Sequence, residues 1–457
     1  MKALVLKGKG NIAYIEKERP TLLAAHGALL KPLLVSPCTS DVHTIWQGSP
    51  KRPDLTLGHE VVARVEEVGA EVTDFHAGDV VAVSAITPDW SQPDVEENYA
   101  HAGHNFSAHM LGNTIDGAFQ ELFYLPYADR NLAHIPDGLT LEDALMCVDV
   151  LQTGFTAVEE AGVKPGDTVV VMGIGAIGLA AILGAKLAGA RTIYAVGSRP
   201  ENVRIAELMS DIHCHVEVLN YRHLHCPLPQ GMHPLANSTG SPVVNYVLTK
   251  TQTKGADEVL ICGGDDLAFP QAIDMVKYGT GVVSNVMYYG ADLDTQDDEL
   301  KTLEAMNSAA AYLTASADAV ATAAAVRATD SISADETVTN PQQSSVTISP
   351  SSPAPQQPSY AVPGDVLRKT HTVTLNDHID CIQIPKFSIG RGMAGKTLKF
   401  SLSRGGRQNL EHVMQIVQES GVHPSIFITE HYDGLDQIAQ AIDDMKERKA
   451  IKIAVKI

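Results

Sequence analysis

Residues 168–188 read TVVVMGIGAIGLAAILGAKLA, and this stretch decides the fold class. The uncharged, mostly β-branched run at 168–172 predicts a buried strand, and the alanine-rich apolar segment at 176–188 predicts a helix. Between them, 173–178 forms the pattern G-x-G-x-x-G. Such a turn is typical of a dinucleotide site, because the helix N-terminus offers free N–H groups to a pyrophosphate. We therefore assign the cofactor loop to Gly173, Ile174, Gly175, Ala176, Ile177 and Gly178.

The chain beyond residue 151 repeats this alternation of apolar runs with helical segments. Buried strands separated by helices predict an α/β fold with a doubly wound parallel sheet of the Rossmann type. Residues 1–150 hold short β-branched runs separated by turns, which predicts a mostly antiparallel β domain. The expected strands are 33–36, 61–68, 80–85, 192–196, 216–219, 258–262, 282–286, 397–402 and 451–455, and the expected helices include 267–276 and 409–419.

A low-complexity segment interrupts this alternation. Positions 305–328 hold 12 alanines in 24 residues, which favours a helix, whereas positions 341–363 carry 6 prolines in 23 residues and cannot bury a core. We interpret the whole segment as an insertion. The expected domains are 1–150 completed by 404–457, 151–290 completed by about 379–403, and the insertion at 291–378.

Composition and charge exclude several classes of protein. The chain has 457 residues, and 34 Lys and Arg against 54 Asp and Glu give a net charge of −20. This excess of acid repels a phosphate backbone, so we expect no nucleic-acid partner. Six cysteines without a Cys-x-x-Cys pair favour a reducing, cytoplasmic location. No apolar run predicts a signal peptide or a membrane span.

The end of the second expected strand indicates which dinucleotide binds. An NAD site usually places an acidic residue there to bind the ribose 2′-hydroxyl. This sequence instead reads VGSRP at 196–200, where Gly197 leaves room, Ser198 offers a hydrogen bond and Arg199 supplies a fixed positive charge. Tyr221, after the third strand, is placed to flank the same group. The pattern predicts NADP, and the alternative is a surface loop with a solvated arginine.

A candidate metal site lies near the N-terminus. PCTSDVH at 37–43 supplies Cys38, and GHE at 58–60 supplies His59. Thiolate and imidazole are ligands that zinc prefers, and a catalytic zinc needs a third protein ligand and one open position. By itself, one Cys with a His 21 residues later more often marks a buried structural cysteine.

Together, the metal and dinucleotide motifs resemble those of the medium-chain zinc-dependent alcohol dehydrogenases. The resemblance is closest to the NADP-dependent secondary-alcohol (isopropanol) dehydrogenases, through IEKERP at 15–20, SPCTSD at 36–41, TPDW at 87–90 and VGSRP at 196–200. It covers the chain outside the insertion and the polar stretch at about 223–242. The resemblance implies a GroES-like catalytic domain, a Rossmann-type NADP domain, and interconversion of secondary alcohols and ketones in a homotetramer.

The resemblance also implies roles for individual residues. The implied zinc ligands are Cys38, His59, Asp149 and, as an exchangeable ligand, Glu60. Cys147 is a rival thiolate, but it lies two positions before Asp149, which we prefer. Zinc would polarise the substrate oxygen, Ser40 would contact that oxygen, and His43 would pass the proton on. The remaining implied positions are Thr39 and Asp41 in the catalytic segment, with Asp41 orienting His59, and Thr153, Val286, Met287 and Tyr288 beside the cofactor.

The sequence departs from the family pattern at several places. Residues 84–146 contain no Cys, so a second, structural zinc is not expected. His109 stands where a pocket tryptophan is expected, which leaves the preferred substrate size open. A histidine and cysteine cluster from His213 to Cys226 matches no closed zinc motif, although its ligand types suit a metal. Two rival interpretations remain, a zinc-free quinone reductase and a non-enzymatic scaffold on the same fold.

Overall fold

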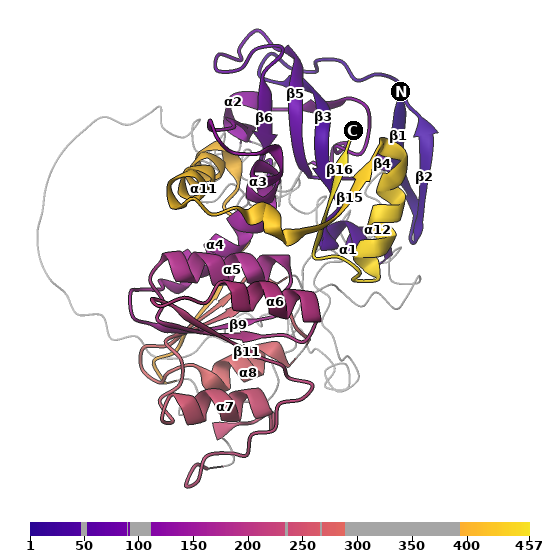
Figure 1. The fold of residues 1–457 in the computed structure, drawn as a ribbon. Coiled ribbons are helices and arrows are strands. Elements are labelled where there is room, and N and C mark those ends of the chain that lie inside the picture. Colours follow the sequence, from indigo (N-terminus) through magenta and orange to yellow (C-terminus); the bar gives the residue numbers. More distant parts are fainter. Residues whose placement is uncertain (47–52, 89, 92–110, 234–235, 266, 288–393) are drawn as a thin grey trace, which may run out of the picture. The chain divides into compact units, whose positions relative to one another are not determined.

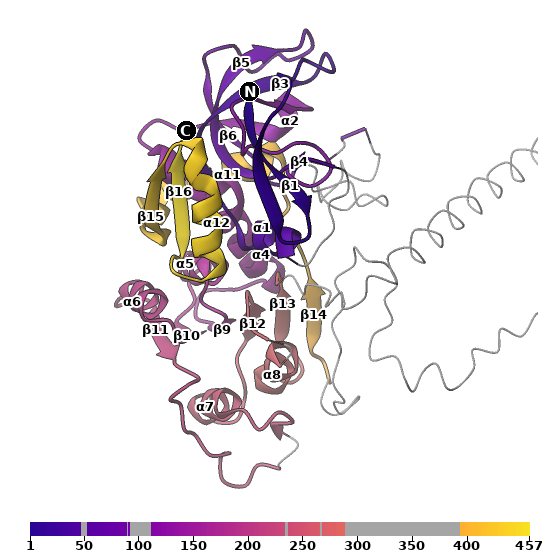
Figure 2. The ribbon, with the colours of Figure 1, turned by 90° about the vertical axis from the view of Figure 1, so that its right-hand side faces the viewer.

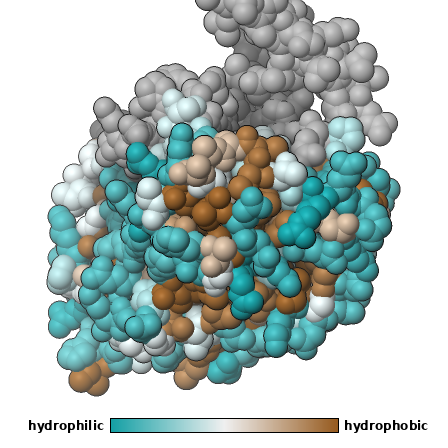
Figure 3. Space-filling view, turned by 90° about the horizontal axis from the view of Figure 1, so that it is seen from above, coloured by the Kyte–Doolittle hydropathy of each residue, from teal (hydrophilic) through white to brown (hydrophobic). Residues whose placement is uncertain are grey.

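The computed structural model describes residues 1–46, 53–88, 90–91, 111–233, 236–265, 267–287 and 394–457 (Figure 1). By compactness the chain divides into residues 1–290 with 382–457, and residues 291–381. The second unit lies outside the described residues, and with it lie the alanine-rich and proline-rich stretches. In the described part, no helix is both long and apolar enough to cross a membrane. Figure 3 shows one face of the molecule, on which hydrophobic residues gather across the middle and hydrophilic residues surround them.

A fully parallel sheet forms one half of the described structure. Its strands are β9 (Thr168–Met172), β10 (Thr192–Val196), β11 (His215–Leu219), β12 (Glu258–Ile261), β13 (Val282–Asn285) and β14 (Thr397–Phe400). They pair in the order β11-β10-β9-β12-β13-β14, and Figure 2 shows them side by side. The order reverses between β9 and β12, and cofactors bind at the carboxyl ends of strands at such a switch point.

Helices cover both faces of this sheet (Figure 1). One face carries α4 (Gln152–Ala161), α5 (Ala176–Leu187) and α6 (Pro200–Leu208), and the other carries α7 (Pro242–Lys250) and α8 (Ala268–Met275). Side chains of β9 alternate between the two resulting cores. Val169 and Val171 pack with α5, whereas Val170 and Met172 pack with α7 and α8. Burial on both faces explains why this strand contains no charged residue.

The other half is built on a mostly antiparallel sheet. Its strands are β3 (Ala28–Ser36), β5 (Glu60–Val68), β6 (Val80–Val83), β7 (Phe123–Leu125), β8 (Leu132–His134), β15 (Ile428–Asp433) and β16 (Lys452–Lys456). They pair in the order β15-β16-β3-β5-β6-β8, with β7 beside β3. A smaller sheet joins β1 (Lys2–Gly8), β2 (Asn11–Glu16) and β4 (Leu55–Thr56). The end of the chain therefore completes the sheet that its beginning starts.

The helical elements of this half surround its sheet. They are α1 (Thr39–Trp46), α2 (Ala128–Asn131), α3 (Leu141–Met146), the π-turn η1 (Cys147–Leu151), α11 (Gly406–Ser420), η3 (Pro424–Phe427), η4 (Leu435–Gln437) and α12 (Ile438–Lys446). The expected fold class is confirmed, with a parallel Rossmann-type sheet and an antiparallel GroES-like sheet. One strand is longer than expected, because β3 begins at Ala28 and accommodates Pro32 at a shift in its pairing with β5.

Candidate active site

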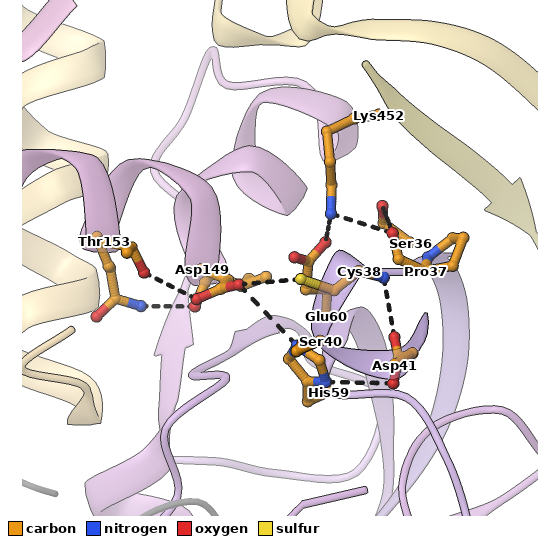
Figure 4. A network of polar contacts seen from close by, with 12 residues as sticks. Ser36, Pro37, Cys38, Ser40, Asp41, His59, Glu60, Asp149, Thr153 and Lys452 are labelled. Carbon is orange, nitrogen blue, oxygen red and sulfur yellow. Dashed lines mark hydrogen bonds and ion pairs between the residues drawn. The ribbon is translucent and has the colours of Figure 1, made fainter. Parts of the chain in front are cut away.

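Three segments that are distant in sequence bring the expected zinc ligands together. β3 ends at Ser36, two residues before Cys38, and β5 begins at Glu60, directly after His59. Ser36 and Glu60 are paired across these strands, so Cys38 and His59 lie at one end of the sheet. Asp149 enters from η1. The ligand atoms of Cys38, His59, Glu60 and Asp149 all lie within 4.8 Å of one another (Figure 4).

The imidazole of His59 is turned so that its two nitrogens face different partners. Nδ1 lies 3.6 Å from Asp41 Oδ1, and Nε2 lies 4.0 Å from Asp149 Oδ2. Asp41 is itself buried and accepts a hydrogen bond of 2.8 Å from the Cys38 N–H. One carboxylate thus fixes both the loop that carries Cys38 and the ring of His59. Such a partner leaves Nε2 directed toward the other ligands.

Burial and charge act in opposite directions on these groups. Burial raises the pKa of the Cys38 thiol. Burial by itself would lower the pKa of His59, but the charge and hydrogen bond of Asp41, together with Cys38, outweigh it and raise that pKa well above its ordinary value. Burial would raise the pKa of Asp149, but the positive charge of His59, with Glu60, Lys452 and Thr153 acting in the same direction, outweighs it and lowers that pKa. A bound divalent cation would favour the thiolate and both carboxylates, because it is the largest local charge.

Glu60 and Lys452 form a buried ion pair at the back of the site. Glu60 Oε2 lies 2.5 Å from Lys452 Nζ, and the two side chains are 0% and 2% exposed. Lys452 also donates a hydrogen bond of 3.2 Å to the carbonyl of Pro37, next to Cys38. The other oxygen of Glu60, Oε1, is buried without a hydrogen-bond partner among the described residues. An orphaned carboxylate oxygen beside Cys38, His59 and Asp149 fits a metal ion with sulfur, nitrogen and oxygen ligands.

The π-turn separates the two rival ligands. Cys147 is fully buried in the core around α5, and burial raises its pKa strongly. Asp149 instead faces Cys38, whose Sγ lies 3.8 Å from its Oδ2. Thr153 lies one turn later on α4 and donates a hydrogen bond of 3.0 Å to Asp149 Oδ1. The structure therefore places Asp149, and not Cys147, with the other expected ligands.

The expected proton path begins beside the expected metal ligands. Ser40 lies on α1, and its Oγ is 3.2 Å from His59 Nε2. His43 is half-buried three residues further along the same helix, a spacing that puts it on the face of Ser40. Thr39 is the first residue of that helix.

The glycine loop has the close packing that a dinucleotide site requires. Gly173 has a φ of +80°, and a Cβ there would lie 2.5 Å from Gly263, at the end of β12. A Cβ on Gly178 would lie 1.9 Å from the Gly173 carbonyl oxygen. Only glycine fits at either position, so the turn stays tight and α5 begins at the switch point. Ile174 is buried, whereas Gly175, Ala176 and Ile177 are half-buried.

Positive charge gathers at the end of β10. The NH2 nitrogen of Arg199 lies 3.8 Å from where a Cβ on Gly175 would be, so this guanidinium overhangs the glycine loop. Gly197 has no room for a side chain, since a Cβ would meet Ile174 at 2.1 Å. The Ser198 side chain lies close enough to the Tyr221 hydroxyl to lower the pKa of Tyr221. The expected residues for the adenosine end are thus brought together.

Two basic residues, one beside the metal site and one near Arg199, had no signal in the sequence. Lys452 and Arg448 both come from the C-terminal segment, and Arg448 lies near enough to Arg199 to lower its pKa further, after burial. A basic residue some 250 positions away carries no local pattern that would place it there.

The remaining expected residues lie partly outside the described structure. Val286 and Met287 follow β13, while Tyr288 and His109 lie outside the described residues.

The histidine and cysteine cluster is not assembled into a ligand group. Cys214 is buried, His215 faces Glu217 at 3.9 Å, and Cys226 contacts the Pro227 carbonyl. Within the described ranges, the group at Cys38 is the one whose spacing could hold a metal ion.

Comparison with known proteins agrees with this geometry. Residues 24–137 match the alcohol dehydrogenase GroES-like domain, and residues 176–313 match the zinc-binding dehydrogenase domain. The NADP-dependent isopropanol dehydrogenase of Clostridium beijerinckii is 32% identical, over 98% of this chain and 97% of its own. That of Entamoeba histolytica is 40% identical, over 64% of this chain and 74% of its own.

Solved structures show the same fold. The alcohol dehydrogenase of Thermus sp. ATN1 superposes with a TM-score of 0.66 at 22% identity, with 100% of both chains covered. The alcohol dehydrogenase of Aeropyrum pernix gives a TM-score of 0.66 at 16% identity, again with 100% of both chains covered. With the two domain matches and relatives that span nearly its whole length, the chain belongs to the medium-chain, zinc-binding alcohol dehydrogenase family.

Proposed function

We propose that this protein is a zinc-dependent oxidoreductase that interconverts secondary alcohols and ketones with NADP(H). The observation that carries the proposal is the set of four ligand atoms from Cys38, His59, Glu60 and Asp149 within 4.8 Å. It lies in the same compact unit as a glycine loop of the dinucleotide type. When bound, zinc polarises the substrate oxygen and NADP takes or gives the hydride.

Individual residues of the chain bind the metal, transfer the proton and position the ligands. Cys38, His59 and Asp149 hold the metal, and Glu60, paired with Lys452, is the exchangeable fourth ligand. Ser40 accepts the proton of the substrate hydroxyl at its Oγ and passes it toward His43, a role that the 3.2 Å between Ser40 Oγ and His59 Nε2 supports. Asp41 positions His59, as its 3.6 Å contact with Nδ1 supports.

Arg199 determines the preference for NADP over NAD. A guanidinium suits a phosphate through charge-assisted hydrogen bonds, and no acidic residue at 197–200 is present to bind a free 2′-hydroxyl. Gly173, Gly175 and Gly178 keep the backbone close to the pyrophosphate, and Val286, Met287 and Tyr288 belong to the nicotinamide side.

We place the protein in the cytoplasm as a homotetramer that acts on a small secondary alcohol or ketone. Free thiols support a cytoplasmic location, since none of the five cysteines that the structure describes is in a disulfide: Cys38, Cys147, Cys214, Cys226 and Cys262. Light scattering of the purified protein measures the number of subunits directly, and a monomer would contradict the proposed tetramer.

The decisive test combines metal analysis with kinetics. We expect about one zinc per chain, oxidation of 2-propanol in preference to ethanol, and NADP⁺ in preference to NAD⁺. Cys38→Ser should lose zinc and turnover while still binding NADP⁺, because the cofactor loop is untouched. Cys226→Ser, a free cysteine outside the ligand group, is the matched control and should keep both.

The same experiment separates the rival functions. A zinc-free quinone reductase would turn over quinones with NADPH and contain no stoichiometric metal. A scaffold would produce no NADPH from any alcohol. Full activity and metal content in Cys38→Ser would show that the metal site lies elsewhere.

A further inference from the structure

A pocket of about 520 Å³ lies between two helices that flank the parallel sheet and the segment that follows α11. α5 contacts both α6 and η3, and all three elements contribute lining residues. Leu183, Ile205 and Phe427 are buried there and belong to the apolar core of this half. None of the lining residues is a proposed metal ligand or cofactor residue, so the pocket is separate from the site described above.

The mouth of the pocket is apolar on both sides. Leu208 of α6 is 60% exposed and Ile426 of η3 is 45% exposed, and both line the pocket. An apolar molecule that enters between them removes both side chains from water, which is favourable. The volume also falls in the range of about 300–1,000 Å³ that is typical of pockets for small molecules. Size and lining therefore fit a small, mainly apolar ligand.

The two lining side chains that can carry a positive charge are already paired. Lys186 Nζ lies 2.7 Å from Asp211 Oδ2 and donates a hydrogen bond of 2.8 Å to the Met209 carbonyl. His423 Nδ1 lies 3.3 Å from Oδ2 of the buried Asp143. A ligand carboxylate would lose water here without gaining an unpaired cation, which is unfavourable. The charges of the lining therefore favour an uncharged ligand.

His423 gives the pocket a directed hydrogen-bonding atom. Asp143 faces His423 Nδ1 and also accepts hydrogen bonds from the Thr140 hydroxyl at 2.8 Å and the Ser425 N–H at 3.0 Å. A neutral imidazole with Nδ1–H directed at a carboxylate presents Nε2 as an acceptor. The side chain of His423 is 73% exposed, so a hydroxyl of a bound molecule can reach Nε2.

We propose that this pocket binds an uncharged, mainly apolar molecule that carries a hydroxyl group. Its apolar part lies against Leu183, Leu208 and Ile426, and its hydroxyl donates a hydrogen bond to His423 Nε2. The proposal goes beyond the oxidation of alcohols, because it uses neither the metal ligands nor the glycine loop. The ligand contacts α5 and α6 beside the parallel sheet and η3 of the other half, so binding stabilises the folded state.

The probe that tests the pocket is 2-naphthol, a fluorescent phenol that is uncharged at neutral pH and cannot be oxidised to a ketone. Its binding to the full-length protein is compared with that of naphthalene, which lacks the hydroxyl, and of 2-naphthoate, which carries a negative charge instead. We expect naphthalene to bind about fivefold more weakly, because one hydrogen bond is lost. The affinity for 2-naphthoate should be lower than that for 2-naphthol by about tenfold or more.

Substitutions then locate the bound molecule. Leu208→Asp places a charge in the apolar wall at an exposed position and should weaken 2-naphthol binding about tenfold. His423→Ala should lower the affinity for 2-naphthol to that for naphthalene and leave naphthalene binding unchanged. Leu23→Asp, at an exposed leucine outside the pocket, is the matched control and should bind as wild type. Cys38→Ser should also keep binding, because the metal site is not involved.

Each other result contradicts the proposal in a different way. If 2-naphthol does not bind, or binds equally well to Leu208→Asp, the pocket is not a ligand site. If Cys38→Ser abolishes binding, the probe occupies the metal site instead. If 2-naphthoate binds as tightly as 2-naphthol, the uncharged ligand class is refuted. Absence of alcohol oxidation in the wild-type protein would overturn only the proposed function, because binding of 2-naphthol is measured without turnover.

Discussion

Replacing Lys452 by methionine should destabilise the protein severely. Its Nζ lies 2.5 Å from Glu60 Oε2, and the two side chains are 2% and 0% exposed. Removing one member of a buried ion pair leaves the other charge away from water and uncompensated, which costs about 3–5 kcal/mol. The hydrogen bond to the Pro37 carbonyl is lost as well. We therefore expect Lys452→Met to lower the free energy of unfolding by about 3–5 kcal/mol, a large fraction of a typical total.

A double-mutant cycle in urea measures this pair. Glu60→Gln removes the negative charge at nearly constant side-chain shape. The double variant Lys452→Met, Glu60→Gln should therefore lose about 2–3 kcal/mol less free energy of unfolding than the sum of the losses in the two single variants. The cycle is run with a chelator present so that metal binding does not enter. Lys449→Met is the control, because this lysine is 56% exposed and solvent screens its ion pairs, so its loss should change the stability little. Strict additivity of the two site substitutions would refute the reasoning.

Further predictions address the cofactor, pH and the insertion. Arg199→Ala should weaken NADP⁺ binding by roughly 1.5–3 kcal/mol for each charge-assisted hydrogen bond lost and leave NAD⁺ nearly unchanged, as calorimetry would show. Burial, with Asp167 and Asp257, raises the pKa of Glu258 from 4.5 to about 9, so the folded state favours the neutral acid and stability should fall as pH rises between these values. Glu258→Gln should flatten that fall in thermal unfolding at pH 5, 7 and 9; an unchanged slope would contradict it. Replacing 305–363 by a short Gly-Ser linker should keep hydride transfer within a few-fold of wild type, since every proposed site residue lies outside it; a folded but inactive variant would show that the segment is required.

Local chemistry explains what could be predicted from the sequence. The strand at 168–172 and the helix after it were expected almost to the residue. The signals for both, a β-branched run and a glycine turn, depend only on residues close together in the sequence. The first half of β3 was not expected, because Lys31 and Pro32 interrupt its apolar pattern. The strand tolerates Pro32 where its pairing with β5 shifts, a tertiary adjustment that the sequence does not display.

Contacts between distant segments lie beyond such local patterns. Cys38 and His59 could be proposed as ligands from residue type and family resemblance, and pairing of β3 with β5 brings them together. Lys452 could not, because its partner Glu60 lies hundreds of residues earlier and a lysine near the C-terminus usually faces solvent. A buried charged residue can be recognised only when the fold shows which distant residue pairs with it.

The choice between Cys147 and Asp149 shows where residue type and local geometry give different answers. Two positions on an α-helix point in nearly opposite directions, so only one of the pair can face the metal site. Thiolate is the better zinc ligand by type, but within the π-turn η1, which contains both residues, Cys147 and Asp149 point to different surroundings. Cys147 fills the core around α5, and Asp149 meets Cys38 and is held by Thr153. A carboxylate in place of a second thiolate gives the metal a harder ligand, and Lys452 then lies where it can balance the charge of Glu60.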